Sequence, residues 1–147
     1  MATQTEYVEC QVHIAASPET VFSFFTDSTK MLKWQGIAAR LDPQPEGEFF
    51  CDLDDGIVMS GKFLELDPFK RLLFSFGWQG HHVVSPGSTR VEVLVAEEGG
   101  GTLRTLRHPG LPADEHDMHS QGWMFYLERL VIVAGGGDAG PHRKPGQ

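Results

Sequence analysis

The sequence has few cysteines and no long apolar run. Among its 147 residues are only 2 cysteines, Cys10 and Cys51, which are far apart, lie in strand-like runs and form no C-x-x-C motif. We therefore expect two small buried hydrophobic residues and a reducing, intracellular setting. Nowhere does the chain offer the roughly 18 continuous apolar residues that a membrane-spanning helix needs. No membrane insertion is expected.

Positive charge is also scarce, because 12 Lys and Arg face 20 Asp and Glu, for a net charge of -8. Such a charge repels nucleic acid, so we expect no nucleic-acid partner. The N-terminus lacks the basic and apolar segments of a secretory signal, which favours a cytoplasmic protein. No P-loop, G-x-G-x-x-G or G-x-S-x-G motif occurs, so the catalytic residues stay unknown and no cofactor is predicted.

The hydrophobic pattern predicts an α+β fold in one domain over 1–134. Alternating apolar residues predict a first strand over 6–15. Ser17-Pro18-Glu19 is typical of a helix start, and it predicts a helix to about Asp27 and a second short one over 28–34. Five further strands are expected over 48–53, 57–66, 72–78, 89–95 and 101–108. Successive hairpins make the sheet antiparallel.

A long helix is predicted over 113–134, followed by a tail rich in Gly and Pro. The helix has one apolar face, and on a helical projection Asp114, Asp117, Gln121, Glu128 and Arg129 fall opposite to it. The tail, 135–147, has no large apolar residue with which to offset its ordering entropy. We expect it to be disordered.

Several local signatures in this order resemble the START-like helix-grip (SRPBCC) superfamily, in the branch similar to the C-terminal domain of the activator of Hsp90 ATPase. The matching segments are 17–22, 32–34, 61–68 and 102–108, together with Gly122-Trp123 followed by Leu127 and Leu130. The likeness extends from about Val8 to Ala134. One departure is Gln35, which stands where many relatives repeat the tryptophan.

The resemblance implies a six-stranded curved sheet around the C-terminal helix, with a cavity between them. In relatives this cavity holds apolar or amphipathic small molecules. The implied function is binding of a lipid-like or aromatic, polyketide-like molecule by a carrier, sensor or sequestering protein. Two alternatives remain, a cyclase, aromatase or hydrolase using the same pocket, and a chaperone-linked protein-interaction module. A homodimer is also an open possibility.

The candidate ligand-binding residues are the apolar and aromatic side chains on the predicted inner face and four polar ones among them. Each apolar residue has an alternative role as ordinary core, because the inner face of any sheet is apolar. The full set is Trp34, Phe49, Met59, Phe63, Phe76, Trp78, Val93, Arg104, Leu106, His108, His116, His119, Trp123 and Leu127.

Arg104 is notable because it shares a face with Leu106 and His108 on the last predicted strand. A buried guanidinium needs an anion. The anion is either a protein carboxylate such as Glu65 or Glu92, or a carboxylate or phenolate of a ligand.

A metal site is a weaker interpretation. His108, His116 and His119 could gather with Asp117 or Glu115 at one corner between strand and helix. Their spacing matches no known metal motif, however, and we predict no metal.

Overall fold

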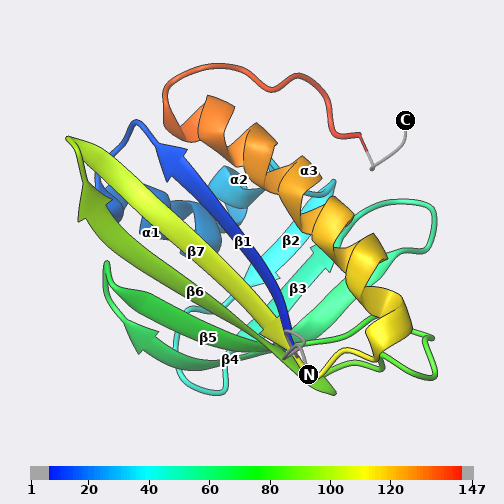
Figure 1. Ribbon diagram of the computed structural model, residues 1–147. Coiled ribbons are helices and arrows are strands. Elements are labelled where there is room, and N and C mark those ends of the chain that lie inside the picture. Colours follow the sequence, from blue (N-terminus) through cyan, green and yellow to red (C-terminus); the bar gives the residue numbers. More distant parts are fainter. Residues whose placement is uncertain (1–6, 144–147) are drawn as a thin grey trace.

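One antiparallel sheet and a long helix across it dominate the structure, a computed structural model in which residues 7–143 are described (Figure 1). The seven strands follow the order β1-β7-β6-β5-β4-β3-β2. No helix in this range is long and apolar enough to cross a membrane. The elements are β1 (Tyr7–Ile14), α1 (Pro18–Thr26), α2 (Ser28–Met31), β2 (Ala38–Leu41), β3 (Glu48–Asp52), β4 (Val58–Asp67), β5 (Arg71–Phe76), β6 (Thr89–Glu98), β7 (Gly101–Pro109), the 3-10 turn η1 (Ala113–Glu115) and α3 (His116–Ala134).

The α+β helix-grip class is confirmed, but the expectation of six strands is wrong by one. The strand missed is β2, which pairs antiparallel with β3 and places Leu41 opposite Phe49. Its sequence, Ala-Ala-Arg-Leu, is short and has no clear apolar alternation, so periodicity cannot detect it.

The first helix starts as its sequence predicts. The Ser17 hydroxyl accepts a hydrogen bond from the Thr20 backbone N–H at 3.2 Å, and Pro18 occupies the first helical position. Asp27 ends α1 and caps α2 in the same way, through the Lys30 N–H at 3.0 Å. The second helix is shorter than expected, because after Met31 the chain continues to Trp34 as turns.

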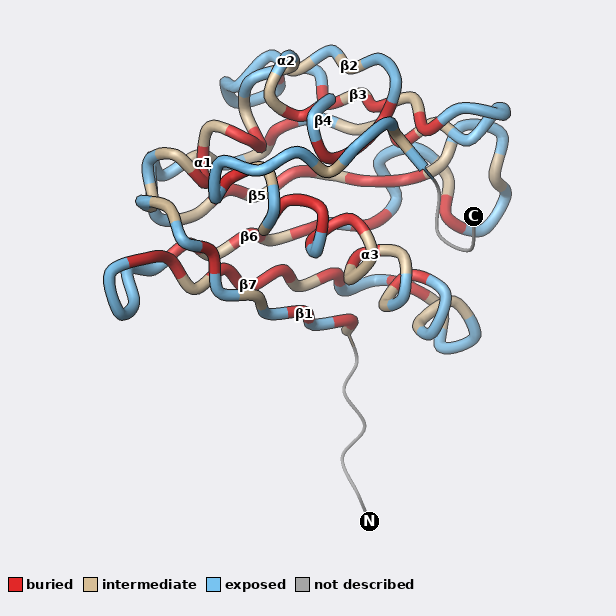
Figure 2. Tube along the Cα trace, turned by 90° about the horizontal axis from the view of Figure 1, so that it is seen from above, coloured by how far each residue is buried: buried red, intermediate tan, exposed pale blue. Residues whose placement is uncertain are grey.

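The inner face of the sheet matches the predicted alternation. Along β7, Arg104, Leu106 and His108 are all fully buried. The Arg104 guanidinium lies 5.1 Å from the Phe25 ring of α1, and His108 is hydrogen-bonded to Trp123 of α3. Residues 104 and 108 share one face of a strand, so α1 and α3 cover the same side of the sheet. Figure 2 shows the buried segments gathered between the strands and these helices.

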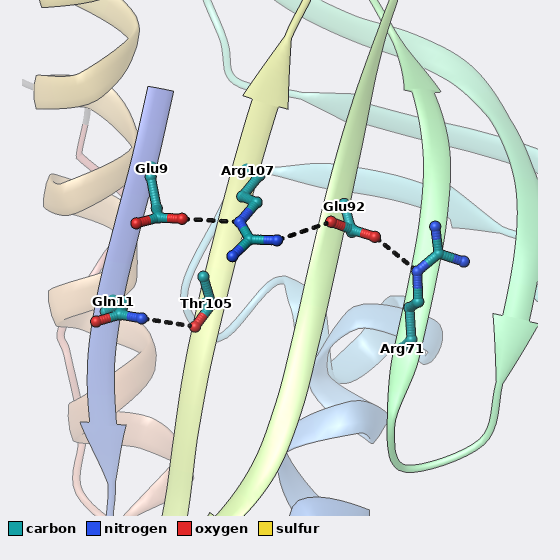
Figure 3. A network of polar contacts seen from close by, with 6 residues as sticks. All are labelled: Glu9, Gln11, Arg71, Glu92, Thr105 and Arg107. Carbon is teal, nitrogen blue, oxygen red and sulfur yellow. Dashed lines mark hydrogen bonds and ion pairs between the residues drawn. The ribbon is translucent and has the colours of Figure 1, made fainter. Parts of the chain in front are cut away.

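The outer face carries a ladder of ion pairs across five strands, and Figure 3 shows its links from β1 through β7 and β6 to β5. Arg107 of β7 lies 2.7 Å from Glu9 of β1 and 3.7 Å from Glu92 of β6. Glu92 in turn lies 2.6 Å from Arg71 of β5, which also contacts Glu65 at 3.1 Å. These side chains are partly exposed, so each pair contributes at most about 1 kcal/mol to stability.

Both cysteines are free and buried, as expected. The Cys10 thiol lies 4.0 Å from the Ser120 carbonyl of α3, and the Cys51 thiol lies 3.6 Å from the Gln35 carbonyl. Both are small core residues, so the backbone of Ser120 and of Gln35 can pack close to the sheet.

The described part of the tail, 135–143, returns along α3. The Arg129 guanidinium donates to the carbonyls of Ala139 and Gly140 at 2.9 and 3.0 Å, and the Tyr126 hydroxyl lies 3.0 Å from His142 Nε2. Arg129 is therefore only 5% exposed, and its predicted place on the solvent face is wrong. Disorder was predicted for the whole tail, 135–147, and residues 144–147 lie outside the described residues.

Replacing Gly61 and Gly122 by alanine should have opposite effects on the stability of the fold. A Cβ on Gly61 of β4 would collide with the Ser75 carbonyl of β5, whereas a Cβ on Gly122 of α3 would meet no atom within 4 Å. We expect Gly61→Ala to lower the free energy of unfolding by about 1–3 kcal/mol, and Gly122→Ala to raise it by about 0.5–1 kcal/mol through helix propensity. Denaturant unfolding measures both. Equal effects would contradict the close approach of β4 to β5.

Candidate functional site

A pocket of about 810 Å³ opens between the β3–β4 and β5–β6 connections and the first half of α3. This volume is in the range typical of small-molecule sites. Its lining is mainly apolar and aromatic. The lining residues are Gln35, Leu53, Gly56, Ile57, Val58, Met59, Phe76, Trp78, Gln79, Gly80, His81, Met118, His119, Gln121, Gly122, Trp123 and Tyr126.

Five predicted ligand-binding residues line this pocket, namely Met59, Phe76, Trp78, His119 and Trp123. The other nine do not. His116 lies at the start of α3, where its ring is within 3.1 Å of the Leu111 carbonyl. Those buried in the interior are Trp34, Phe49, Phe63, Val93, Arg104, Leu106, His108 and Leu127.

Trp34 was expected to close one end of the cavity, but it does not line the pocket. Its side chain is fully buried, its indole N–H donates to the Phe24 carbonyl at 3.1 Å, and its ring packs edge-on against Phe25. It attaches the turn after α2 to α1.

The remaining pocket residues lie in turns and loops, where the sequence has no repeating hydrophobic pattern. Leu53 and Ile57 flank the β3–β4 turn, Gln79 and His81 lie in the β5–β6 loop, and Gln35 lies in the turn after α2. Loops carry no repeating pattern that relates them to a cavity. The one available signal was that both hairpin connections must lie at the same end of an antiparallel sheet.

A directed chain of hydrogen bonds connects α3 to the sheet behind the pocket. The Trp123 indole N–H donates to His108 Nδ1 at 3.1 Å. His108 Nε2 therefore carries the ring proton and faces the Thr89 hydroxyl at 2.8 Å, and this hydroxyl donates to the Phe76 carbonyl at 2.9 Å. His108 and the Thr89 hydroxyl each accept one hydrogen bond and donate one, which determines the neutral His108 tautomer.

A second indole–imidazole pair forms the pocket wall. The Trp78 indole N–H donates to His119 Nε2 at 3.0 Å, and His119 Nδ1 lies 2.9 Å from the Glu115 carbonyl, to which it donates. The Trp78 indole N–H and His119 Nε2 are thus each other's hydrogen-bond partner between the sheet and the helix. The wall they form presents aromatic surface to the pocket.

These partners remove the basis for a metal site. Both ring nitrogens of His108 and His119 are hydrogen-bonded to protein groups, so neither has a free lone pair for an ion. Over 7–143 no group of three or more His, Cys, Asp or Glu side chains is placed to hold a metal ion.

Both buried imidazoles are neutral at physiological pH. Burial lowers the pKa of His108 to about 3, with repulsion from His119 and His116 as smaller causes. Burial also lowers the pKa of His119, and this outweighs the opposing hydrogen bond to the Glu115 carbonyl. These two imidazoles therefore carry no charge that would attract an ionic ligand.

Arg104 is fully buried, and its three guanidinium nitrogens have no hydrogen-bond partner among the described residues. The expectation of a Glu65 or Glu92 partner is wrong, because both carboxylates bind Arg71 on the outer face. Burial lowers the pKa of Arg104 to about 9, which leaves it charged at pH 7. A contact with a ligand anion stays a prediction, and Arg104 does not line the pocket.

The comparison with protein families agrees with this architecture. Residues 15–135 match the family described as activator of Hsp90 ATPase homolog 1-like protein. The chain belongs to the AHSA1-like family. The match covers everything from the end of β1 to the end of α3, and it confirms the resemblance read from the sequence.

Three relatives give the scale of likeness. The human activator of 90 kDa heat shock protein ATPase homolog 1 is 26% identical over 82% of this AHSA1-like chain, which spans only 35% of the human protein. The solution structure of an AHSA1-like protein from Rhizobium etli is 44% identical with a TM-score of 0.73, covering 92% of this chain and 85% of the other. The crystal structure of CalU16 from Micromonospora echinospora is 25% identical with a TM-score of 0.72, covering 88% and 76%.

The buried His108 predicts a specific pH dependence of stability in this AHSA1-like chain. The unfolded chain takes up a proton near pH 6.5, whereas folded His108 stays neutral down to about pH 3. The unfolded state therefore binds more protons between these values, and the free energy of unfolding falls as pH decreases below 6.5. Lowering the pH from 7 to 5 should reduce the free energy of unfolding of wild type by about 2 kcal/mol relative to that of His108→Gln, which denaturant unfolding at both pH values measures. A difference independent of pH would contradict this.

Replacing Arg104 by an apolar residue should not destabilise the folded protein. Because the charged guanidinium is desolvated and has no described partner, we expect Arg104→Met to leave the free energy of unfolding unchanged or to raise it by about 1–4 kcal/mol. Arg107→Met on the outer face of the same strand is the control, and it should cost no more than about 1 kcal/mol. A large loss of stability in Arg104→Met alone would reveal an internal anion.

Proposed function

We propose that this AHSA1-like chain binds a hydrophobic or amphipathic small molecule in the pocket between the sheet and α3, as a carrier, sensor or sequestering protein. Lipid-like and aromatic, polyketide-like molecules are the expected classes. The observation that carries the proposal is the space itself. About 810 Å³ remains although Trp34 lies in the core and Trp78 and Trp123 already form walls.

The wall chemistry supports an apolar ligand. Met59, Phe76, Trp78 and Trp123 supply apolar surface, and the indole N–H groups of both tryptophans are occupied by imidazoles. Burying an apolar ligand here gains about 25 cal/mol per Å² of surface removed from water. Ile57 and Met118 extend the apolar surface to the mouth, where both are exposed.

The protein-interaction alternative expects a collapsed cavity, and the open pocket favours ligand binding instead. Likeness to part of the human Hsp90 activator supports a chaperone partner only as a further prediction, since the chain spans 35% of that protein. A homodimer likewise stays a prediction, which size-exclusion chromatography with light scattering tests.

Filling the pocket tests the proposal directly. Gly122 lines the pocket and has open space beside it, so Gly122→Phe should place a ring where the ligand would lie. We expect the variant to fold and to lose at least about tenfold in affinity for any ligand found. Tryptophan fluorescence and native mass spectrometry, with fatty acids, aromatic polyketides and steroids, measure binding.

The matched control is Glu128→Phe, on an exposed position of the same helix. It adds the same ring outside the pocket and should leave affinity unchanged. Failure of every ligand class to bind wild type below about millimolar, on the scale of weak specific binding, would overturn the proposal.

A further inference from the structure

The C-terminal tail leaves α3 through a tight turn made of glycines. Gly136 has a φ of 97°, in the left-handed region that favours glycine, and the Gly137 N–H donates to the Ile132 carbonyl at 2.8 Å. This turn sends residues 138–143 back along the helix instead of away from it (Figure 1). A segment whose composition predicts disorder is thereby brought against α3.

The tail is docked on α3 through the Arg129 guanidinium. Its Nη1 and Nη2 donate to the carbonyls of Ala139 and Gly140 at 2.9 and 3.0 Å. Its Nε donates to the Trp34 carbonyl at 3.1 Å. Arg129 thus connects the tail to the turn after α2, where the next residue, Gln35, belongs to the pocket lining.

A second contact reaches the pocket wall directly. Tyr126 of α3 lines the pocket, and its hydroxyl lies 3.0 Å from Nε2 of His142 in the tail. The two rings are stacked, with centroids 5.7 Å apart and planes inclined by 7°. Tyr126 is only 3% exposed when the tail is docked. The tail therefore packs on a residue that also forms part of the pocket.

The docked and released states of the tail are close in free energy. Residues 135–143 contain no apolar side chain larger than Ala and Pro, so docking buries little apolar surface. Ordering one residue costs about as much free energy as one hydrogen bond returns. The few hydrogen bonds of the tail therefore only just offset its loss of freedom, and a small interaction elsewhere can shift the balance.

We propose that the tail is a strap whose docking and ligand binding in the pocket strengthen each other, with His142 as a positioning residue that acts through Tyr126. This deepens the proposed function and rests on it. With the tail docked, an apolar ligand meets a wall in which Tyr126 is already held. With the tail released, binding must also order Tyr126, so affinity is lower. Linkage makes the effect reciprocal, and bound ligand favours the docked tail by the same factor.

The substitution His142→Ala tests the coupling, because it removes the contact with Tyr126 and changes no residue of the lining. The probe is N-phenyl-1-naphthylamine, an uncharged apolar dye whose fluorescence rises in apolar sites. We expect the variant to bind the dye about fivefold more weakly than wild type, as for the loss of one hydrogen bond. His142→Gln keeps a polar group near the position of Nε2 and should lose less. His13→Ala, on β1 and outside the lining, is the control and should bind like wild type.

The order of the tail in His142→Ala provides the reciprocal readout. Heteronuclear nuclear Overhauser effects of the backbone amides between residues 138 and 143 report their motion on the picosecond to nanosecond timescale. Without the dye we expect lower values than in wild type, and values that rise toward wild type when the dye saturates the pocket. A tail that only stabilises the fold would not respond to a dye bound in the pocket.

Equal dye affinity of wild type and His142→Ala, or tail amides that do not respond to the dye, would overturn the coupling while leaving the pocket proposal intact. If the dye does not bind wild type, the tightest-binding fatty acid, polyketide or steroid takes its place in the same measurements. Failure of all of them to bind would instead overturn the pocket proposal, and the coupling with it.

Discussion

The hydrogen bond from the Trp123 indole to His108 connects the long C-terminal helix to the middle of the sheet. It continues through the Thr89 hydroxyl to the Phe76 carbonyl, so a helix, two strands and the end of a third share one directed chain. A buried chain with every donor and acceptor used is rigid, because breaking any member leaves an unpaired polar group in the interior. The helix is thereby held at a fixed distance from the sheet, and the pocket lies beside this attachment.

The same chain decides the chemistry of the pocket wall. An indole N–H is a potential ligand contact, yet both tryptophans of the lining use theirs on an imidazole. The imidazoles are in turn kept neutral, since burial lowers the pKa of both. The wall formed by Trp78, His119 and Trp123 is therefore aromatic and uncharged. The turn after α2 adds Gln35 to the lining, and its amide oxygen is buried without a hydrogen-bond partner among the described residues.

Periodicity in the sequence was enough for the class of fold and for the inner face of the strands. The residues from Phe49 to Leu106 that alternate inward are buried, except Trp78, which is half-buried in the pocket wall. A period of two leaves little choice once one face is apolar. It failed for β2, which is short and lacks alternation, and for Arg129, which the returning tail covers.

The pocket was less predictable than the core around it. Its aromatic walls depend on pairs far apart in sequence, because Trp78 and His119 are 41 positions apart and His108 and Trp123 are 15 positions apart. No local pattern encodes such pairs. Trp34 and Trp78 look alike in sequence, but one lies in the core and the other in the wall, because only the curvature of the sheet decides which large side chain borders empty space. Gln35 appeared only as a departure from the family pattern.

Among residues 7–143, two buried side chains have polar atoms without a hydrogen-bond partner, and only one of the two residues lines the pocket. Arg104 lies four residues along β7 from His108, or about 13 Å of extended strand, and is enclosed by core that includes Phe25. An anion at Arg104 would need a space of its own, apart from the pocket. Gln35 belongs to the pocket lining, although its amide oxygen is itself buried. The charge of Arg104 therefore lowers the stability of the core and contributes nothing to the pocket lining.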